Sequence, residues 1–190
     1  MIPLFDTSTQ LEPLRPQIDD AIKRVLDSGR YILGPEVSSF EAEFAKYVGT
    51  DHAIGVGNGT DALSIALLAA GVQAGDDVVV PSFTFYASAE AALTIGANVV
   101  YCDVDPDTLN VTAETVAAAL TPNTTAVIAV HLFGLPAPID QLRPLADKHD
   151  FKIVEDAAQA VGATLNGERA GSLGDVATFS FFPSKNLGAF

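Results

Sequence analysis

The stretch AVIAVHLFGLPAPIDQLRPLADKHDFKIVE, residues 126–155, decides the fold class. It begins with an apolar run at Ala126–His131, continues through a segment of helical character at Ile139–His149, and ends in a second apolar run at Lys152–Glu155. Short apolar strands that alternate with helices are typical of a parallel sheet, because such strands are buried on both faces. This region therefore predicts an α/β architecture.

The same alternation extends through the whole chain beyond Asp51. Further strands are expected at Ala53–Val56, Asp77–Val80, Asn98–Cys102 and Val176–Phe181, and further helices at Asp61–Ala70, Ala87–Ile95 and Ala113–Leu120. Before Asp51, amphipathic helices are expected at about Arg15–Ser28 and Glu36–Val48, each followed by a glycine. The sequence thus predicts an N-terminal helical segment over residues 1–50. Over residues 51–190 it predicts a domain with a mostly parallel central sheet flanked by helices.

Composition excludes several classes of partner. The chain has 24 acidic and 10 basic residues, a formal net charge of -14, which repels nucleic-acid phosphates and anionic lipids. The single cysteine, Cys102, cannot form an internal disulfide, and no Cys/His cluster has the spacing of a zinc site. The N-terminus lacks the pattern of a secretory signal, and the apolar runs are shorter than a membrane span. We expect a cytoplasmic protein with no nucleic-acid, membrane or metal partner.

In open α/β sheets, ligands bind beyond the carboxyl ends of the strands, so the residues there are candidates for a binding site. Gly57–Asp61 lies between a predicted strand and a predicted helix, where backbone N–H groups and the positive helix end favour an anion such as phosphate. The alternative is a glycine-rich turn with Thr60 or Asp61 as the helix N-cap. The loop matches neither the P-loop pattern nor GxGxxG, which argues against a dinucleotide-binding domain.

Asp156 ends an apolar strand, where a carboxylate has little reason to lie unless it holds a cationic group. The alternative is that Asp156 caps a helix over Ala157–Ala160. The neighbouring Glu155 is interpreted as a surface residue, because adjacent side chains of a strand point to opposite faces.

Lys185 lies in the stretch FFPSKNLG, residues 181–188, which follows an aromatic strand. Most lysines are solvated, and that is the alternative here. The aromatic and apolar neighbours could instead exclude water from the amine, as an amine nucleophile requires. Pyridoxal phosphate (PLP) has a group for each of these three signals. Its phosphate suits the glycine-rich turn, its ring nitrogen suits Asp156, and its aldehyde suits Lys185.

The chain also resembles the DegT/DnrJ/StrS family of PLP-dependent nucleotide-sugar aminotransferases of fold type I. The resemblance covers essentially all 190 residues and rests on an ordered set of motifs. They are YILGPEV (31–37), GTDAL (59–63), PSFTF (81–85), HLFG (131–134), EDAAQA (155–160) and FSFFPSKNLG (179–188).

The resemblance implies a role for each site residue. Lys185 would form the Schiff base with PLP and move a proton during catalysis, and Asp156 would pair with the pyridine nitrogen. Gln159 lies three residues after Asp156, the spacing of one helical turn, and would hydrogen-bond the ring hydroxyl. Phe85 would stack on the ring, although without the motif it would be interpreted as a core residue. The phosphate would be held by Ser180 and the turn Gly59, Thr60 and Asp61, with Asp61 contributing its backbone N–H.

The resemblance further implies a nucleotide-linked keto sugar as substrate, glutamate or glutamine as amino donor, and a homodimer. The family continues past residue 190 into the rest of the large domain and a small C-terminal domain, both absent here. We therefore expect exposed apolar faces and weak or no PLP binding by the 190 residues alone. Leu135 departs from a glutamine common in relatives, which leaves sugar contacts there open. Two alternatives are a PLP-dependent sugar dehydratase, whose family pattern replaces the Schiff-base lysine with histidine, and a non-catalytic regulatory relative that binds PLP or a sugar.

Overall fold

The computed structural model describes residues 6–189, and the chain forms two compact units, Met1–Gly55 and Val56–Phe190. The first unit contains helices α1 (Ser8–Ser28) and α2 (Pro35–Val48). In the second unit the helices are α3 (Gly59–Ala69), α4 (Ala87–Thr94), α5 (Ala113–Ala119), the 3-10 turn η1 (Leu132–Gly134) and α6 (Ile139–His149). The strands are β1 (Asp77–Pro81), β2 (Asn98–Cys102), β3 (Thr124–Val130), β4 (Lys152–Asp156), β5 (Thr164–Leu165), β6 (Glu168–Arg169) and β7 (Val176–Thr178).

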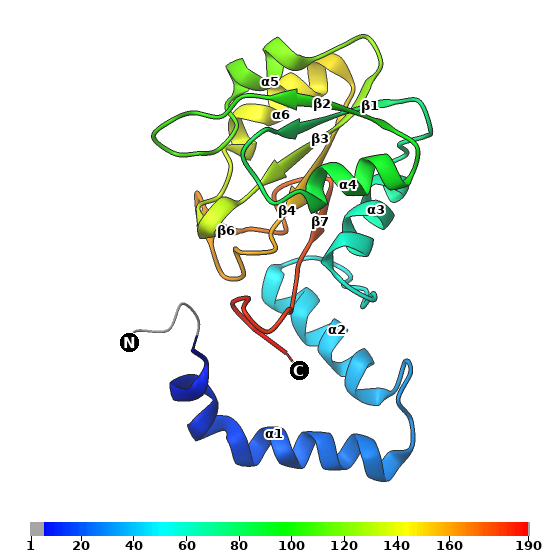
Figure 1. Cartoon of the computed structure of the whole chain (residues 1–190), viewed down its shortest axis with the longest axis vertical. Helices are drawn as coiled ribbons and strands as arrows, with labels where there is room; N and C mark the ends of the chain where they lie inside the picture. Colours follow the sequence, from blue (N-terminus) through cyan, green and yellow to red (C-terminus); the bar gives the residue numbers. More distant parts are fainter. Residues whose placement is uncertain (1–5, 190) are drawn as a thin grey trace. The chain divides into compact units, whose positions relative to one another are not determined.

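Five strands of the second unit form a parallel sheet in the order β2-β1-β3-β4-β7, and β5 and β6 form a separate antiparallel hairpin. Figure 1 shows the sheet between its helices. Alternate residues of each strand pack on opposite faces, as the period of a strand requires. On β4, Val154 packs with α3 and α4, whereas Ile153 packs with α5 and α6. The predicted α/β fold with a parallel sheet flanked by helices is confirmed.

Two predicted strands differ from the structure by more than two residues. Ala53–Val56 forms no strand: the Gly55 N–H is bonded to the Glu41 carboxylate at 2.6 Å, and the Ile54 side chain is 81% exposed. An apolar run becomes a strand only where a neighbouring strand pairs with its backbone, and among residues 6–189 this run has none. The last strand, β7, ends at Thr178 rather than at Phe181, because its partner β4 ends at Asp156, opposite Thr178.

The first unit consists of two helices whose ends follow the expected rules. Both α1 and α2 end at a glycine with positive φ, 64° at Gly29 and 94° at Gly49, where a side chain would be strained. The α1 helix begins at Ser8 and contains Pro13 and Pro16, so it is longer than the predicted Arg15–Ser28. No helix in residues 6–189 combines the length and the apolar character that crossing a membrane requires.

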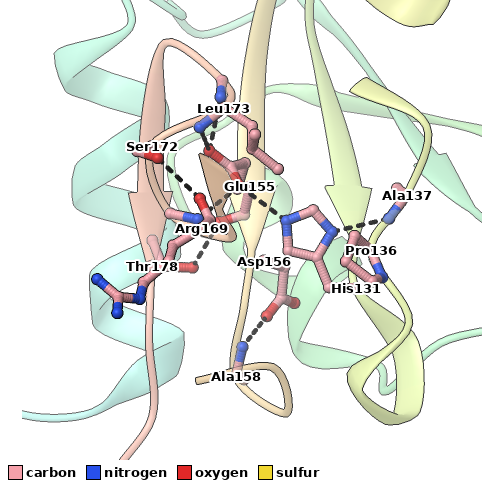
Figure 2. Close-up of polar contacts among 12 residues, drawn as sticks. His131, Pro136, Ala137, Glu155, Asp156, Ala158, Arg169, Ser172, Leu173 and Thr178 are labelled. Carbon is pink, nitrogen blue, oxygen red and sulfur yellow. Dashed lines mark hydrogen bonds and ion pairs between the residues drawn. The ribbon is translucent and has the colours of Figure 1, made fainter. Parts of the chain in front are cut away.

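A buried carboxylate, Glu155, connects β4 to the loop before β7, contrary to the expectation of a surface residue (Figure 2). Its Oε2 accepts hydrogen bonds from His131 Nε2 at 2.8 Å and from the Gly171 N–H at 2.7 Å. Its Oε1 accepts the N–H groups of Leu173 at 2.8 Å and Gly174 at 2.6 Å. The chain folds over this strand end, so the alternation of strand faces does not bring Glu155 to solvent.

The hydrogen bond at the second ring nitrogen of His131, Nδ1, determines the tautomer of the ring. His131 Nδ1 accepts the N–H of Ala137 at 2.9 Å, so the proton of the neutral ring lies on Nε2 and is donated to Glu155 (Figure 2). Burial alone would raise the pKa of Glu155, but the hydrogen bonds from His131, Gly171 and Gly174 outweigh burial and lower the pKa. Glu155 is therefore ionised and fully hydrogen-bonded inside the protein.

We predict that Glu155→Gln lowers the free energy of unfolding by about 3–5 kcal/mol, because the new amide group turns a donor toward buried N–H groups that then lack an acceptor. Urea denaturation at pH 7 measures this. The matched control is Glu168→Gln at an exposed position of β6, with an expected change within about 0.5 kcal/mol. Equal losses in the two variants would contradict a structural role for the Glu155 carboxylate.

Candidate active site

The carboxyl ends of the parallel strands lie at one edge of the sheet (Figure 1). The segments that follow them are Ser82–Phe85 after β1, His131 after β3, Ala157–Gln159 after β4, and Ser180–Lys185 after β7. Half of the predicted site residues are in these segments, Asp156 is the last residue of β4, and the α3 N-terminus adds the other three. This edge is therefore the candidate active site.

The glycine-rich turn meets Ser180 at the start of α3. A Cβ placed on Gly59 would lie 3.2 Å from Ser180 Cβ and 3.5 Å from Ser180 Oγ, so this close approach favours glycine. The N-cap is Asn58, not Thr60 or Asp61: Asn58 Oδ1 accepts the Asp61 N–H at 2.9 Å, and Asn58 Nδ2 donates to Asp61 Oδ2 at 2.8 Å. The Asp61 N–H expected to bind an anion is therefore already bonded within the turn.

The N–H groups of Gly59 and Thr60 remain at the helix start. The hydrogen bonds of residues 6–189 give neither of them a protein acceptor, and α3 has 11 residues, so its positive end adds to their attraction for an anion. Together with the Ser180 hydroxyl, they form a polar turn that can receive a phosphate-sized anion. A carboxylate, Asp61, lies beside it but is held by Asn58.

Asp156 lies at the end of β4 and is 7% exposed. Its Oδ2 accepts the hydroxyl proton of Ser88 at 2.9 Å. Its Oδ1 accepts the N–H of Ala158 at 3.2 Å (Figure 2). Burial raises its pKa, while the hydrogen bonds from Ser88 and Ala158 and the electrostatic interactions with His131 and Lys185 act in the opposite direction. The ionised carboxylate is thus incompletely compensated, and a cation bound there would stabilise it.

The expected helix after Asp156 is absent, since residues 157–163 form turns. The proposed helical spacing of Asp156 and Gln159 is therefore wrong. Gln159 is instead oriented by the backbone of the HLFG turn: its Oε1 accepts the Phe133 N–H at 2.9 Å. Phe133 has a φ of 54°, and Gly134 follows with a φ of 88°. Because the side-chain oxygen is bound to Phe133, the Gln159 amide nitrogen is the group left to donate to a ligand.

Lys185 is partly buried in a loop closed by its own backbone. The Lys185 N–H donates to Phe182 O at 2.7 Å, the Gly188 N–H donates to Lys185 O at 3.0 Å, and the Ala189 N–H donates to Phe181 O at 2.9 Å. Gly188 passes so close to Pro183 that an added Cβ would lie 2.2 Å from the Pro183 carbonyl oxygen. The loop geometry thus accounts for the glycine of the FFPSKNLG stretch and holds the lysine near the sheet edge.

Phe85 is not a core residue: its side chain is 63% exposed just before α4, and its ring meets that of Tyr86 edge to face with centroids 4.8 Å apart. An exposed aromatic face is available to stack on a planar ligand.

The structure brings the predicted site residues together in groups. Gly59 and Ser180 are in near contact, and the charge of Lys185 acts on Asp156. The contacts of residues 6–189 include no direct bond from Phe85 or Gln159 to Asp156 or Lys185. No three His, Cys, Asp or Glu side chains in the described part of the chain gather closely enough to hold a metal. The edge can therefore receive one anion and one cationic group beside a lysine amine.

Sequence reasoning missed two side chains of this edge, Asn58 and Ser88. The Asn58 signal was present, because an asparagine three residues before Asp61 at a helix start is the pattern of an N-cap. Ser88 gives no such signal, since a serine among alanines in a helix looks like a packing residue. Its importance appears only from its 0% exposure and its bond to Asp156.

The model of the DegT/DnrJ/EryC1/StrS aminotransferase family matches residues 13–190. A dTDP-3-amino-3,4,6-trideoxy-alpha-D-glucose transaminase of Streptomyces venezuelae is 51% identical, over 100% of this chain and 50% of the relative. A pleiotropic regulatory protein of Geobacillus stearothermophilus is 47% identical, over 100% of this chain and 51% of the relative.

Among solved structures, S. venezuelae DesV in complex with a ketimine intermediate has a TM-score of 0.96 and 51% identity. The match covers 100% of this chain and 51% of that structure. The chain therefore spans about half the length of the relatives it matches.

We predict that Asp156→Asn leaves the ligand-free chain at least as stable as the wild type at pH 7. Replacing a buried group that accepts hydrogen bonds normally lowers the free energy of unfolding by about 1–3 kcal/mol. Here the raised pKa means that the folded state binds the Asp156 proton more tightly than the unfolded state does. Ionisation of Asp156 therefore lowers the stability of the folded state as pH rises through the folded pKa. The asparagine amide does not ionise, so the variant avoids this loss of stability. Thermal unfolding between pH 4 and pH 8 measures it: the wild type should lose stability relative to the variant as pH rises.

The matched control is Asp175→Asn. Asp175 faces Arg143 at 3.0 Å and accepts the Ile153 N–H at 2.7 Å, so its ionised form already has a cation and the variant should lose stability at pH 7. A loss of the same size in Asp156→Asn would show that Asp156 is compensated within the chain.

Proposed function

Because the chain belongs to the DegT/DnrJ/EryC1/StrS aminotransferase family, we propose that it is the cofactor-binding part of a PLP-dependent aminotransferase that converts a nucleotide-linked keto sugar to an amino sugar. The family is PLP-dependent. The single observation that carries the proposal for this chain is Asp156, a buried carboxylate at the carboxyl end of β4 that lies within electrostatic reach of Lys185.

The anion site fits the phosphate of PLP. The N–H groups of Gly59 and Thr60 and the hydroxyl of Ser180 would hold it, and the close approach of Gly59 to Ser180 leaves room that a Cβ would fill. Asp61 would contribute through its bond with Asn58, which fixes the turn, rather than through its own N–H.

The buried edge of β4 fits the pyridine ring. Asp156 would hold the ring nitrogen protonated, which also compensates a carboxylate whose burial raises its pKa. The Gln159 amide nitrogen, left free by the bond of Oε1 to Phe133, would donate to the ring hydroxyl oxygen, and the exposed face of Phe85 would cover the ring. When bound, PLP supplies an aldehyde for an amine and a ring that withdraws electrons from the reacting carbon.

Lys185 is the proposed covalent attachment point and proton carrier. Its Nζ would bind the aldehyde carbon in the resting enzyme and later hold the proton that leaves the substrate carbon. In the overall reaction, the amino group of glutamate or glutamine replaces the carbonyl oxygen of the sugar, and the donor becomes the corresponding keto acid. A homodimer is part of the proposal, with the partner completing the cofactor site.

A regulatory role is the second candidate, because one relative at 47% identity is named a pleiotropic regulatory protein. The presence of Lys185, Asp156 and Gln159 together favours catalysis, since binding a ligand alone needs no amine nucleophile. Lys185 also argues against the dehydratase alternative, in which a histidine takes its place.

We predict that PLP forms its covalent bond with Lys185. A protein of the relatives' full length that contains this chain is incubated with excess PLP, reduced with borohydride and mapped by peptide mass analysis. The pyridoxyl group should be found on Lys185, and Lys185→Arg should abolish the specific labelling. Labelling that is equal on Lys185 and on the exposed Lys152 of β4 would remove Lys185 from its role.

We predict further that a protein of the relatives' full length that contains this chain transfers the amino group of glutamate or glutamine to a nucleotide keto sugar. Absorbance spectra of the PLP-loaded protein are recorded before and after the donor, and then with a panel of nucleotide keto sugars. A spectral change with the donor that a keto sugar reverses supports the enzyme. Binding of PLP with no response to any donor favours the regulatory relative.

In the same full-length protein, Asp156→Asn should slow the reaction with the amino donor by at least about 100-fold, because the amide cannot hold the ring nitrogen protonated.

A further inference from the structure

We propose that Ser88 is a positioning residue for Asp156, whose carboxylate it anchors in the orientation and charge state that a cationic ligand requires. Ser88 is on α4 and is 0% exposed, and its Oγ donates to Asp156 Oδ2 at 2.9 Å. This inference rests on the proposed function of Asp156, but the hydrogen bond itself can be tested without any ligand.

The environment of Ser88 indicates that its hydroxyl is there for the carboxylate. The other α4 residues on this buried surface are Ala87, Ala89, Ala91 and Ala92, which pack against the sheet with no polar atom. A buried serine in a helix can satisfy its hydroxyl by bonding to a carbonyl of the preceding turn. Ser88 bonds instead to a residue 68 positions away in the sequence. Packing alone would be met by alanine at this position.

The bond acts on the charge of Asp156. A hydroxyl that donates to a carboxylate favours its ionised form and thereby opposes the effect of burial. The Ala158 N–H at 3.2 Å is the other donor that Asp156 receives within residues 6–189, and the charged or titratable groups that act on it are His131 and Lys185. The hydrogen bond from Ser88 is shorter than the one from Ala158, and Ser88 lies on helix α4 rather than in the segment that follows β4.

The position of Ser88 also connects two parts of the proposed PLP site. Phe85 lies three residues earlier, and the Ser88 N–H donates to Phe85 O at 3.3 Å in the first turn of α4. The same short segment thus carries the exposed aromatic ring and the anchor of the buried carboxylate. A rigid helix start that binds Asp156 fixes where the Phe85 backbone lies relative to it.

The test compares Ser88→Ala and Ser88→Thr with the control Ser64→Ala. Ser64 is on the neighbouring helix α3, and within residues 6–189 its hydroxyl bonds the Ala91 carbonyl oxygen at 3.3 Å and no part of Asp156, so it matches the substitution. The carboxyl carbon of Asp156 is titrated by NMR in the ligand-free 190-residue chain and assigned with Asp156→Asn. We expect the pKa of Asp156 to rise by about one further unit in Ser88→Ala, to return toward wild type in Ser88→Thr, and to stay unchanged in Ser64→Ala.

The second measurement, made on a protein of the relatives' full length that contains this chain, is the PLP concentration that half-saturates labelling of Lys185. We expect it to rise about tenfold in Ser88→Ala and to recover in Ser88→Thr. An unchanged Asp156 titration in a folded Ser88→Ala chain overturns the inference. If Ser88→Ala unfolds, Ser88→Cys, which replaces the hydroxyl with a somewhat larger and weaker donor, takes its place with the same expected direction. If a wild-type protein of the relatives' full length labels no lysine while Ser88→Ala still shifts the titration, the proposed function fails and the positioning role stands.

Discussion

The ionised carboxylate of Glu155, buried beneath the sheet edge, is the interaction on which the rest of this edge depends. It accepts hydrogen bonds from the Nε2–H of His131 and from the backbone N–H groups of Gly171, Leu173 and Gly174. Thereby the end of β3 and the loop before β7 are both bound to β4. A charge without these donors would be far too costly inside the protein, so sheet edge and loop must form together. The next residue, Asp156, starts the candidate site, and β7 leads to Ser180 and Lys185.

The two adjacent carboxylates of β4 show how one strand can serve structure and chemistry at once. They lie on opposite faces, as the strand period requires, and the environments of the two faces differ. Glu155 has four donors and a lowered pKa, whereas Asp156 has two donors and a pKa raised by burial. Glu155, whose charge is compensated within the chain, stabilises the fold. Asp156, whose charge is incompletely compensated, is the carboxylate that we propose for ligand binding. Perturbed carboxylates in a polar edge are characteristic of functional sites.

Much of the fold could be predicted from the sequence, because apolar periodicity reports burial directly. The bounds of β2 and α6 match their predicted ranges, Asn98–Cys102 and Ile139–His149, since clear turn residues flank both. Ala53–Val56 failed as a strand because an apolar run says nothing of whether a neighbouring strand exists. Glu155 was misplaced because three of its four donors come from a loop 16 to 19 residues later and the fourth, His131, lies 24 residues earlier. Ser88 was overlooked because its partner lies 68 residues away. The pattern of neighbouring residues in the sequence does not predict such long-range hydrogen bonds.

The motifs of the sequence gain a physical meaning from these contacts. In HLFG, His131 donates to Glu155 while the Phe133 N–H holds the oxygen of Gln159, so this turn orients side chains of EDAAQA rather than acting on a ligand itself. In GTDAL, Asp61 is bound by Asn58, and Gly59 is glycine because Ser180 is so close. The residues of these motifs are thus of two kinds, those proposed to bind a ligand and those that hold the first kind in place. Because the second kind makes bonds that do not need the ligand, the site can be largely preformed before a cofactor binds, and binding then has less conformational entropy to overcome.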